Sequence, residues 1–301
     1  MKQVLVKSPM NYTGGKYKLL PQILPLFPNN GNIKGQFIDL FCGGVNVAAN
    51  VTAKRIIAND FDKNVIGIYS EFKRHMVEDI ISHIERRIKE YELSITNKEG
   101  FDNFRLYYNS CENKNPLDLF VLICFSFNHQ FRFNSKGEFN MPFGKDKSCF
   151  NNTIKRNLIN FKTKIDGIIF TNRSFEELNV EKLTADDFVY CDPPYLITCA
   201  TYNEKDGWNE IKERQLLALL DNLNDNGIKF ALSNVLFSKG KTNDILYEWS
   251  NKYNVYHLNN TYANSNYHTK DKSTKADEVL ITNYPTENNA AFNQAKIPSI
   301  L

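Results

Sequence analysis

Residues 36–44 decide the fold class of this chain: they are Gln36-Phe37-Ile38-Asp39-Leu40-Phe41-Cys42-Gly43-Gly44. The first six residues have the apolar character of a short buried β-strand, and the glycine pair predicts a tight turn after it. A helix of small residues is expected next, from the spacing of Val45, Val47, Ala48 and Ala49. A strand, a glycine turn and a helix in this order predict the start of a parallel α/β sheet.

The same pattern continues along the chain, with one long interruption. Further strands are expected at 55–58, 167–170, 187–191, 228–233, 254–258 and 278–283, and a helix at 210–224. The interruption holds long charged helical stretches and then an aromatic-rich segment at 125–143. We therefore expect an open, mixed α/β domain formed by residues 1–75 and 165–285. A separate, mostly helical domain with one hairpin is expected at 76–164, and a loosely ordered tail at 286–301.

Composition excludes several classes of protein. With 301 residues, 42% of them hydrophobic, the chain can bury a large core. It has no apolar run long enough to span a bilayer, and residues 1–7 lack the apolar run of a signal peptide, so we expect no membrane partner and a cytoplasmic location. The six cysteines and five histidines show no zinc spacing, so no metal is expected. Residues 101–170 carry ten Lys/Arg against six Asp/Glu, which suits a polyanion.

The tetrapeptide Asp192-Pro193-Pro194-Tyr195 follows an apolar strand and can grip an aromatic amine. Such an amine is a poor nucleophile because its lone pair is delocalised into the ring. The Asp192 carboxylate and the Pro193 carbonyl can accept its two N–H groups, and the prolines fix the backbone so that both acceptors are pre-positioned. Tyr195 offers a ring on which an extruded base can stack. The competing interpretation is a rigid turn.

Two more features end neighbouring strands, where ligands of open α/β sheets bind. Gly43-Gly44 lets the backbone approach a ligand closely. Asp60, about twenty residues after the glycine turn, can accept hydrogen bonds from ribose hydroxyls. Together they suit an adenosine-containing cofactor, although a glycine pair after a strand also serves simply as a tight connection.

These motifs occur in one characteristic order, from Tyr12-Thr13-Gly14-Gly15-Lys16 through residues 39–44 and Asn59-Asp60 to Asp192-Pro193-Pro194-Tyr195. The chain resembles a Dam-type adenine-specific DNA methyltransferase of the alpha arrangement, in which the target-recognition segment lies between the cofactor motifs and the catalytic motif. The resemblance spans about 8–284. It implies a Rossmann-like fold with a mixed sheet and an inserted DNA-recognition domain, S-adenosylmethionine as cofactor, and methyl transfer to N6 of a flipped-out adenine in duplex DNA.

Carried over by position, the resemblance assigns roles to the motif residues. Asp192, Pro193, Pro194 and Tyr195 would be catalytic, and Asp192 would also touch the cofactor. Asp60 would hold the ribose. The remaining cofactor contacts would come from Tyr12, Lys16, Asp39, Phe41 and Gly43. A phosphate loop at Gly14-Gly15-Lys16 lacks the required spacing, whereas Lys16 on an ordinary helix surface remains an alternative.

Residues 127–144 resemble the hairpin that family members insert into DNA beside the target. The turn Asn134-Ser135-Lys136-Gly137 is a hairpin signal on its own terms. Arg132 would read a guanine edge, Lys136, Lys145 and Lys147 would meet phosphates, and the expected DNA contacts are Asn128, Gln130, Arg132, Asn134, Lys136, Asn140 and Lys145. Phe131 and Phe133 suit either the hairpin core or DNA. Gln130 stands where relatives that methylate GATC typically carry an apolar residue, which argues against a GATC target.

Three rival functions stay open. A cytosine-N4 methyltransferase performs similar chemistry but more often carries Ser at the position of Asp192. A DNA-binding regulator that has lost activity, and an RNA-directed methyltransferase, are the other two. If the chain is an adenine methyltransferase, a cognate restriction endonuclease is a possible functional partner. The loops at 198–208 and 261–275 are further candidates for contacts with DNA or cofactor.

Overall fold

The computed structural model describes residues 4–198, 207–259 and 276–286. The chain packs as two compact units, which we call the helical unit and the sheet unit. The helical unit comprises Met1–Tyr17, Gly43–Asn50 and Asp62–Asn172. The sheet unit comprises Lys18–Cys42, Val51–Phe61 and Arg173–Leu301. The functional division expected from the sequence, with a recognition domain at 76–164, stays a prediction, and the expected tail lies outside the described residues except for Thr286.

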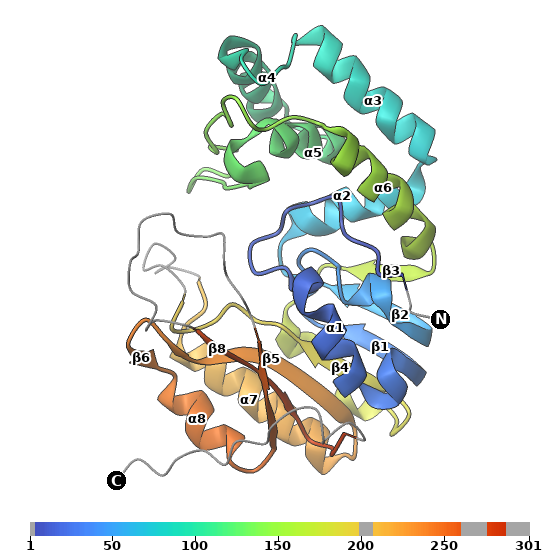
Figure 1. The fold of residues 1–301 in the computed structure, drawn as a ribbon, viewed down its shortest axis with the longest axis vertical. Helices are drawn as coiled ribbons and strands as arrows, with labels where there is room; N and C mark the ends of the chain where they lie inside the picture. The colour runs from blue at the N-terminus through green and yellow to red at the C-terminus, as the bar shows by residue number, and fades with distance from the viewer. Residues whose placement is uncertain (1–3, 199–206, 260–275, 287–301) are drawn as a thin grey trace. The chain divides into compact units, whose positions relative to one another are not determined.

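The sheet unit is built on a mixed β-sheet (Figure 1). Its strands follow the order β2-β1-β4-β5-β8-β7, and β6 pairs with β5. The pairs β1–β2, β1–β4 and β4–β5 are parallel, whereas β8 runs antiparallel to both β5 and β7. The strand bounds are β1 Asn32–Asp39, β2 Thr52–Asn59, β4 Phe188–Cys191, β5 Lys229–Ser238, β6 Lys241–Thr242, β7 Asn254–Leu258 and β8 Asp277–Thr282. The expected open, mixed α/β sheet is confirmed.

The strand order contains a switch point, the place where ligands of such sheets bind. From β1 the chain moves outward to β2, and it later returns to the other side of β1 as β4. The order therefore reverses between β1 and β4, and the carboxyl ends of these two strands flank the switch point. Asp39 ends β1, and Asp192 follows the last residue of β4. Both acidic residues thus lie at the edge of the sheet where open α/β folds bind their ligands.

One face of the sheet is covered by helices α7, Glu210–Asp225, and α8, Asp244–Ser250. Helix α7 begins at Asn209, whose side chain accepts a hydrogen bond from the Lys212 amide, and it buries leucines spaced three or four residues apart. These are Leu216, Leu217, Leu220 and Leu223. Each buried leucine stabilises the unit by about 1.5–3 kcal/mol, so the helix fixes the sheet beneath it.

The other face of the sheet packs aromatic rings. Phe27 contacts Phe188 and Tyr190, with ring centroids 4.8 and 5.3 Å apart, and Phe37 lies against Phe188 at 5.9 Å. Phe27 follows short helical turns that include α1, Leu20–Ile23. Strand β4 is therefore buried on both faces, as its uninterrupted apolar sequence predicts. Its end is held rigidly in place.

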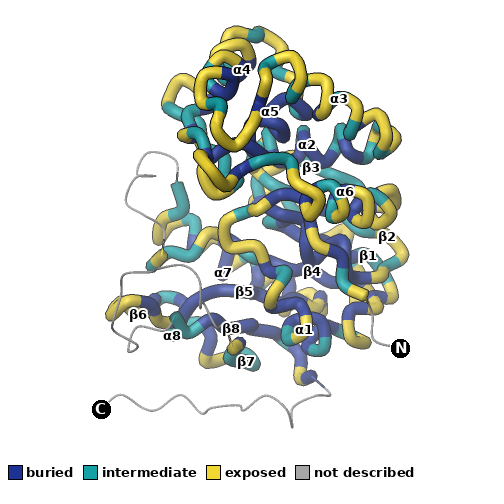
Figure 2. The backbone as a smooth tube through the Cα atoms, turned by 45° about the horizontal axis from the view of Figure 1, so that its top comes forward, coloured by how far each residue is buried: buried dark blue, intermediate teal, exposed yellow. Residues whose placement is uncertain are grey.

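The helical unit is built around helix α5, Pro116–Phe125. Nine of the ten residues of this helix are buried (Figure 2). Pro116 occupies the first turn and the Asn115 side chain accepts from the Leu117 amide, so the helix start is well defined. The other elements of the unit are α2 Lys63–Arg74, α3 Val77–Glu90, α4 Lys98–Ser110, α6 Asn152–Ile165 and β3 Ile168–Thr171. The expected mostly helical segment is confirmed: α2, α3 and α4 pack on α5, and α6 packs on α2 and α3.

The α-helix predicted directly after Gly44 is wrong. That segment contains only a single 3-10 turn, Ala48–Asn50, and Val45 adopts a left-handed backbone with φ of 56°. Side-chain amides explain the difference. Asn50 exchanges hydrogen bonds with the backbone of Val6, at 2.8 and 2.7 Å, and Asn46 accepts from the Ser8 amide at 3.0 Å. The segment pairs with the N-terminal residues instead of winding into a helix.

A membrane-spanning helix is not found in the part of the chain that the structure describes, because none of its helices is both long and apolar enough.

Candidate active site

The end of β4 presents the tetrapeptide that the sequence singles out. Residues 188–191 are all buried, and the chain leaves the sheet at Asp192 without a helical or strand conformation. Pro193 is buried, Asp192 is half-buried and Pro194 is exposed. The prolines restrict the backbone, so the Asp192 side chain and the Pro193 carbonyl are held on a rigid support at the switch point. Such a support suits a group that must meet a ligand in one fixed orientation.

Tyr195 turns its hydroxyl back toward two carboxylates. The hydroxyl lies 3.1 Å from Asp192 Oδ1 and 3.2 Å from Glu278 Oε1, so its single proton can be donated to either carboxylate. Burial raises the pKa of Tyr195 well above its usual value, and the charges of Asp192 and Glu278 add to this shift. The phenol therefore stays protonated and acts as a donor at this site. The sequence had not suggested Glu278, which lies on β8.

Further acidic side chains gather at the neighbouring strand ends. Asp39 is 1% exposed at the end of β1, and Asp60 directly follows β2. Burial raises the pKa of the Cys42 thiol, and the charges of Asp60 and Asp39 raise it further. This edge of the sheet unit is electronegative, which favours a cationic ligand.

Asn59 locks the backbone around these acidic residues. Its side chain donates to the Leu40 and Arg173 carbonyls at 3.1 and 3.0 Å and accepts from the Arg173 amide at 3.1 Å. Its own carbonyl accepts from the Cys42 amide at 2.7 Å. One buried amide therefore fixes the ends of β1 and β2 and the loop at Arg173. Asn59 was part of a quoted motif but not of the predicted site.

Phe41 lies in an aromatic cluster with Phe175 and Trp208. The Phe41 ring centroid is 5.6 Å from each of the other two, and those two are 5.7 Å apart. The Trp208 indole N–H donates to the buried Glu213 carboxylate, which anchors the ring. Phe41 was expected at the cofactor site, and Trp208 ends the 198–208 loop that was expected to contact DNA or cofactor. Phe175 was missed because it lies more than a hundred residues from Phe41 in sequence.

In the helical unit, Tyr12 packs directly on the glycine turn. A Cβ atom on Gly43 would lie 2.7 Å from Tyr12 Cε1, and Gly43 has a φ of +42°, so only glycine fits there. Lys16 is 4% exposed, and its Nζ donates to the Gly14 carbonyl at 2.8 Å. The alternative of Lys16 on an exposed helix surface is wrong, because the ammonium is turned back into its own glycine loop.

The expected hairpin forms around the predicted turn. The Asn134 and Glu138 backbones are hydrogen-bonded at 2.9 Å, and Phe133 and Phe139 form an antiparallel bridge. Phe139 is buried, whereas Phe131 and Phe133 are only half-buried. Arg132 reaches across the hairpin, and its Nε donates to Asn140 Oδ1 at 2.9 Å. The predicted base reader is thus oriented by another predicted DNA contact.

The remaining hairpin candidates lie on its surface or against the N-terminal segment. Lys136 and Lys145 are exposed, and the Asn134 side chain caps the turn by accepting from the Lys136 amide at 2.9 Å. Gln130 lies 3.4 Å from the Thr13 hydroxyl, and the Asn128 carbonyl accepts from Asn11 at 2.9 Å. The hairpin is therefore attached to the segment that carries Tyr12.

The predicted residues fall into two groups, one in each unit. The sheet unit holds Asp39, Phe41, Asp60 and residues 192–195 at one edge of its sheet. The helical unit holds Tyr12, Lys16, Gly43 and the hairpin residues from Asn128 to Lys145. The loop at 261–275 and most of the loop at 198–208 lie outside the described residues.

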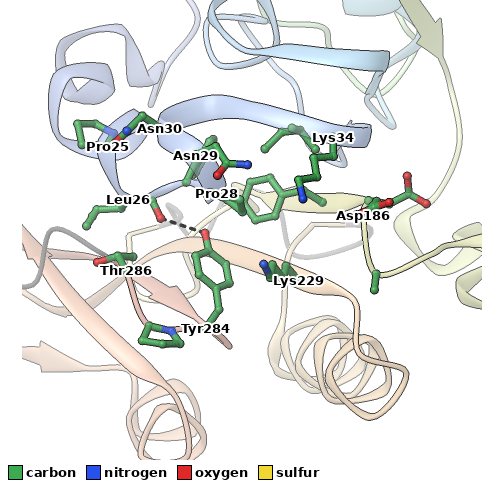
Figure 3. Close-up of a pocket in the computed structure, with 16 residues that line it drawn as sticks. Pro25, Leu26, Pro28, Asn29, Asn30, Lys34, Asp186, Lys229, Tyr284 and Thr286 are labelled. Carbon is green, nitrogen blue, oxygen red and sulfur yellow. Dashed lines mark hydrogen bonds between the residues drawn. The ribbon is translucent and has the colours of Figure 1, made fainter.

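The sheet unit also contains a cavity of about 380 Å³, and Figure 3 shows the residues that line it. Its lining includes Lys34 near the start of β1, Phe188 at the start of β4 and Lys229 at the start of β5. The Tyr284 hydroxyl closes part of it by donating to the Leu26 carbonyl at 3.0 Å. Because the cavity is at the amino ends of the parallel strands, it is distinct from the candidate active site.

The sequence is similar to several curated proteins. It is 50% identical over 286 residues to "Type II methyltransferase M.FokI" of Planomicrobium okeanokoites, which covers 93% of this chain and 43% of that protein. It is 48% identical to "Modification methylase StsI" of Streptococcus sanguinis, over 94% of this chain and 43% of that protein. The chain thus spans less than half the length of these two relatives. A "DNA adenine methylase" of Salmonella typhi is 27% identical over 75% of this chain and 79% of its own length.

Among solved structures, an rRNA methylase from Streptococcus thermophilus aligns over 94% of this chain and all of its own, with a TM-score of 0.36 and 10% sequence identity. The sequence pattern of one family, described as D12 class N6 adenine-specific DNA methyltransferase, matches residues 12–264. The match includes the glycine turn, Asp60, the hairpin and the tetrapeptide at 192–195. The chain therefore belongs to the D12 class N6 adenine-specific DNA methyltransferase family.

Proposed function

We propose that this chain transfers a methyl group from S-adenosylmethionine to N6 of an adenine flipped out of duplex DNA. The observation that carries the proposal is the rigid position of Asp192 and Pro193 at the end of the buried strand β4, beside the switch point of the sheet. Acceptors fixed in this way can grip both N–H groups of the adenine amine and favour a tetrahedral, nucleophilic nitrogen. Base flipping is needed because N6 cannot be reached inside the stacked duplex.

The acidic edge of the sheet unit fits the proposed cofactor. S-adenosylmethionine supplies an electrophilic methyl group on a positively charged sulfonium. Asp39, Asp60 and Asp192 provide the negative charge that attracts such a cation, and Asp60 at the end of β2 is suited to accept from ribose hydroxyls. Phe41, with Phe175 and Trp208 around it, offers aromatic surface for the adenine ring of the cofactor. In the helical unit, Tyr12, Lys16 and Gly43 are proposed as further cofactor contacts.

Asp192 acts in this proposal as an orienting acceptor rather than as a strong base. A carboxylate is a weak base, so the proton that N6 loses can leave to solvent after the methyl group has moved. The flipped base stacks on the face of the Tyr195 ring, while the Tyr195 hydroxyl stays hydrogen-bonded to Asp192. Direct, in-line transfer then depends on the alignment of the target N6 with the methyl group on the sulfonium, and the protein forms no covalent bond to either.

The hairpin is the proposed reader of the DNA sequence. Arg132 presents a guanidinium for a guanine edge, and Asn140 holds it across the hairpin. Gln130 and Asn134 are polar and can bond base edges, while the exposed Lys136 and Lys145 suit phosphates. Asn128 and Asn140 complete the proposed DNA contacts. The type II and modification names of the relatives favour a cognate restriction endonuclease as a functional partner, and a cytoplasmic location stays a prediction.

The proposed function is tested by incubating the chain with duplex DNA and radiolabelled S-adenosylmethionine, followed by single-molecule sequencing of the product. We expect label on the DNA and a modified adenine within one short motif. Binding of duplex DNA without transfer to any sequence would contradict the proposal and favour an inactive regulator.

Asp60→Ala should weaken cofactor binding. The loss of a hydrogen bond to a charged group costs about 1.5–3 kcal/mol, which corresponds to a rise in Kd for S-adenosylmethionine of about tenfold to a hundredfold. Titration calorimetry with the cofactor measures this directly. Asp225→Ala, which removes an exposed carboxylate at the end of α7, serves as the control and should leave the Kd unchanged. An unaltered Kd in Asp60→Ala would exclude Asp60 from the cofactor site.

Arg132→Ala should relax sequence choice instead of abolishing binding. A bidentate contact to the correct base contributes about 1–3 kcal/mol of discrimination, so methylation should spread to sites that differ at one base pair. Sequencing of methylated DNA libraries measures the spread. Lys145→Ala, the matched control, should weaken binding to all sequences alike. It should also reduce the slope of log K for binding against log salt concentration by about one. An unchanged motif in Arg132→Ala would rule out direct readout by this side chain.

A further inference from the structure

Glu278 is an unusual residue for its position in the sheet. It lies on β8 between β5 and β7, opposite Val235 and Leu258, and is only 1% exposed. The next residues of the strand, Val279 to Ile281, are apolar and fully buried. Burial of a carboxylate among such neighbours is costly unless hydrogen bonds compensate, so its presence needs a reason.

One hydrogen bond of Glu278 connects it to the tetrapeptide. Tyr195 has one phenolic proton, and that proton faces two acceptors at almost equal distances, 3.1 Å to Asp192 Oδ1 and 3.2 Å to Glu278 Oε1. The two carboxylates therefore compete for one donor. If Glu278 draws the proton, the oxygen of Asp192 is a stronger acceptor; if it does not, the proton is committed to Asp192 and weakens it.

We propose that Glu278 is a positioning residue for methyl transfer, which acts through the Tyr195 hydroxyl to set the rotation and acceptor strength of the Asp192 carboxylate. This inference rests on the proposed function, because it concerns the same amine-gripping acceptor. The contact joins the loop after β4, which carries both Asp192 and Tyr195, to Glu278 on β8. It also accounts for a tyrosine whose hydroxyl is engaged inside the protein while its ring serves the base.

Glu278→Gln is the most informative variant, since it keeps the shape of the side chain and removes its charge. An amide oxygen is a weaker acceptor than a carboxylate, so more of the phenol proton is committed to Asp192. We expect kcat for methyl transfer to fall about tenfold, and about a hundredfold in Glu278→Leu, the scale typical of a misplaced catalytic group. The KM for S-adenosylmethionine should stay within about twofold.

A double-mutant cycle with Tyr195→Phe separates this role from a structural one. If Glu278 acts through the hydroxyl, Glu278→Gln should have no further effect on kcat once that hydroxyl is gone. Asp277→Asn is the matched control, because the neighbouring carboxylate on β8 binds His257 instead and should leave kcat unchanged. Melting temperatures verify that each variant is folded, and the glutamine variant carries the test if the leucine variant does not fold.

The result that supports the inference is a fall of kcat in Glu278→Gln that disappears in the Tyr195→Phe background. The inference is overturned if kcat is unchanged in Glu278→Gln, or if it falls by the same factor in both backgrounds. Neither of these results touches the proposed function, provided that the unaltered chain methylates adenine. If the unaltered chain transfers no methyl group to adenine, the proposed function itself fails.

Discussion

Asp192→Ala is expected to reduce methyl transfer to DNA by at least about 10²–10³-fold while the protein stays folded. The reason is that one of the two acceptors proposed to hold the target amine is lost, and preorganised polar groups of this kind contribute that much to catalysis. The fold should survive because Asp192 is half-buried and lies just beyond the end of β4, outside the packed strand. Single-turnover transfer of a labelled methyl group, with circular dichroism, measures both effects.

The matched control for this prediction is Asp186→Ala, which removes an exposed carboxylate near the amino end of the same strand. Its activity should equal that of the unaltered chain. Asp192→Asn should retain more activity than Asp192→Ala, since the amide still has an acceptor oxygen. Near-normal turnover in Asp192→Ala would refute the role given to this residue.

Asp118→Ala is expected to lower the free energy of unfolding by about 3–5 kcal/mol, the scale for removal of one partner of a buried ion pair. Asp118 lies on α5 with 3% of its side chain exposed, and it accepts from His83 at 2.7 Å and from Arg87 at 2.9 and 3.0 Å. When Asp118 is removed, the Arg87 guanidinium stays mostly buried but loses the carboxylate that balances its charge. Urea unfolding at neutral pH measures the change.

Glu90→Ala provides the control, because Glu90 binds the same Arg87 but its side chain is 47% exposed. An exposed ion pair contributes at most about 1 kcal/mol, so this variant should be nearly as stable as the unaltered chain. If Asp118→Ala and Glu90→Ala were equally stable, the cluster on α5 would not hold the helical unit together.

The contribution of Asp118 should also depend on pH. Burial by itself would raise the pKa of Asp118, but hydrogen bonds and charge from His83 and Arg87 outweigh it, and the pKa in the folded protein is lowered. A lowered pKa means that the stabilisation is complete above the pKa of the unfolded chain, about 3.9, and is lost as pH falls through the folded value. The difference in stability between the unaltered chain and Asp118→Ala should therefore shrink as pH falls below about 4.

The sequence predicts the parts of the fold that depend on local pattern. Strands β4 and β7 and helix α7 lie within a residue or so of where the apolar spacing places them. Asp192 could be predicted because prolines and a buried strand fix it through neighbours in sequence. The helix after Gly44 could not, because Asn46 and Asn50 bond residues some forty positions earlier.

The contacts that complete the candidate site depend on residues distant in sequence. Glu278 lies 83 residues from Tyr195, and Trp208 lies far from Phe41, so no spacing rule connects them. The one available signal was a glutamate at the start of an otherwise apolar strand, next to Val279. The bond from Arg132 to Asn140 across the hairpin also needs the pairing register, which the turn residues indicate but do not fix.

The most direct test of the central claim is mass spectrometry of nucleosides from duplex DNA treated with the chain and S-adenosylmethionine, beside an identical reaction with Asp192→Ala. The account predicts N6-methyladenine in the first reaction and none above background in the second. N4-methylcytosine without N6-methyladenine would contradict it.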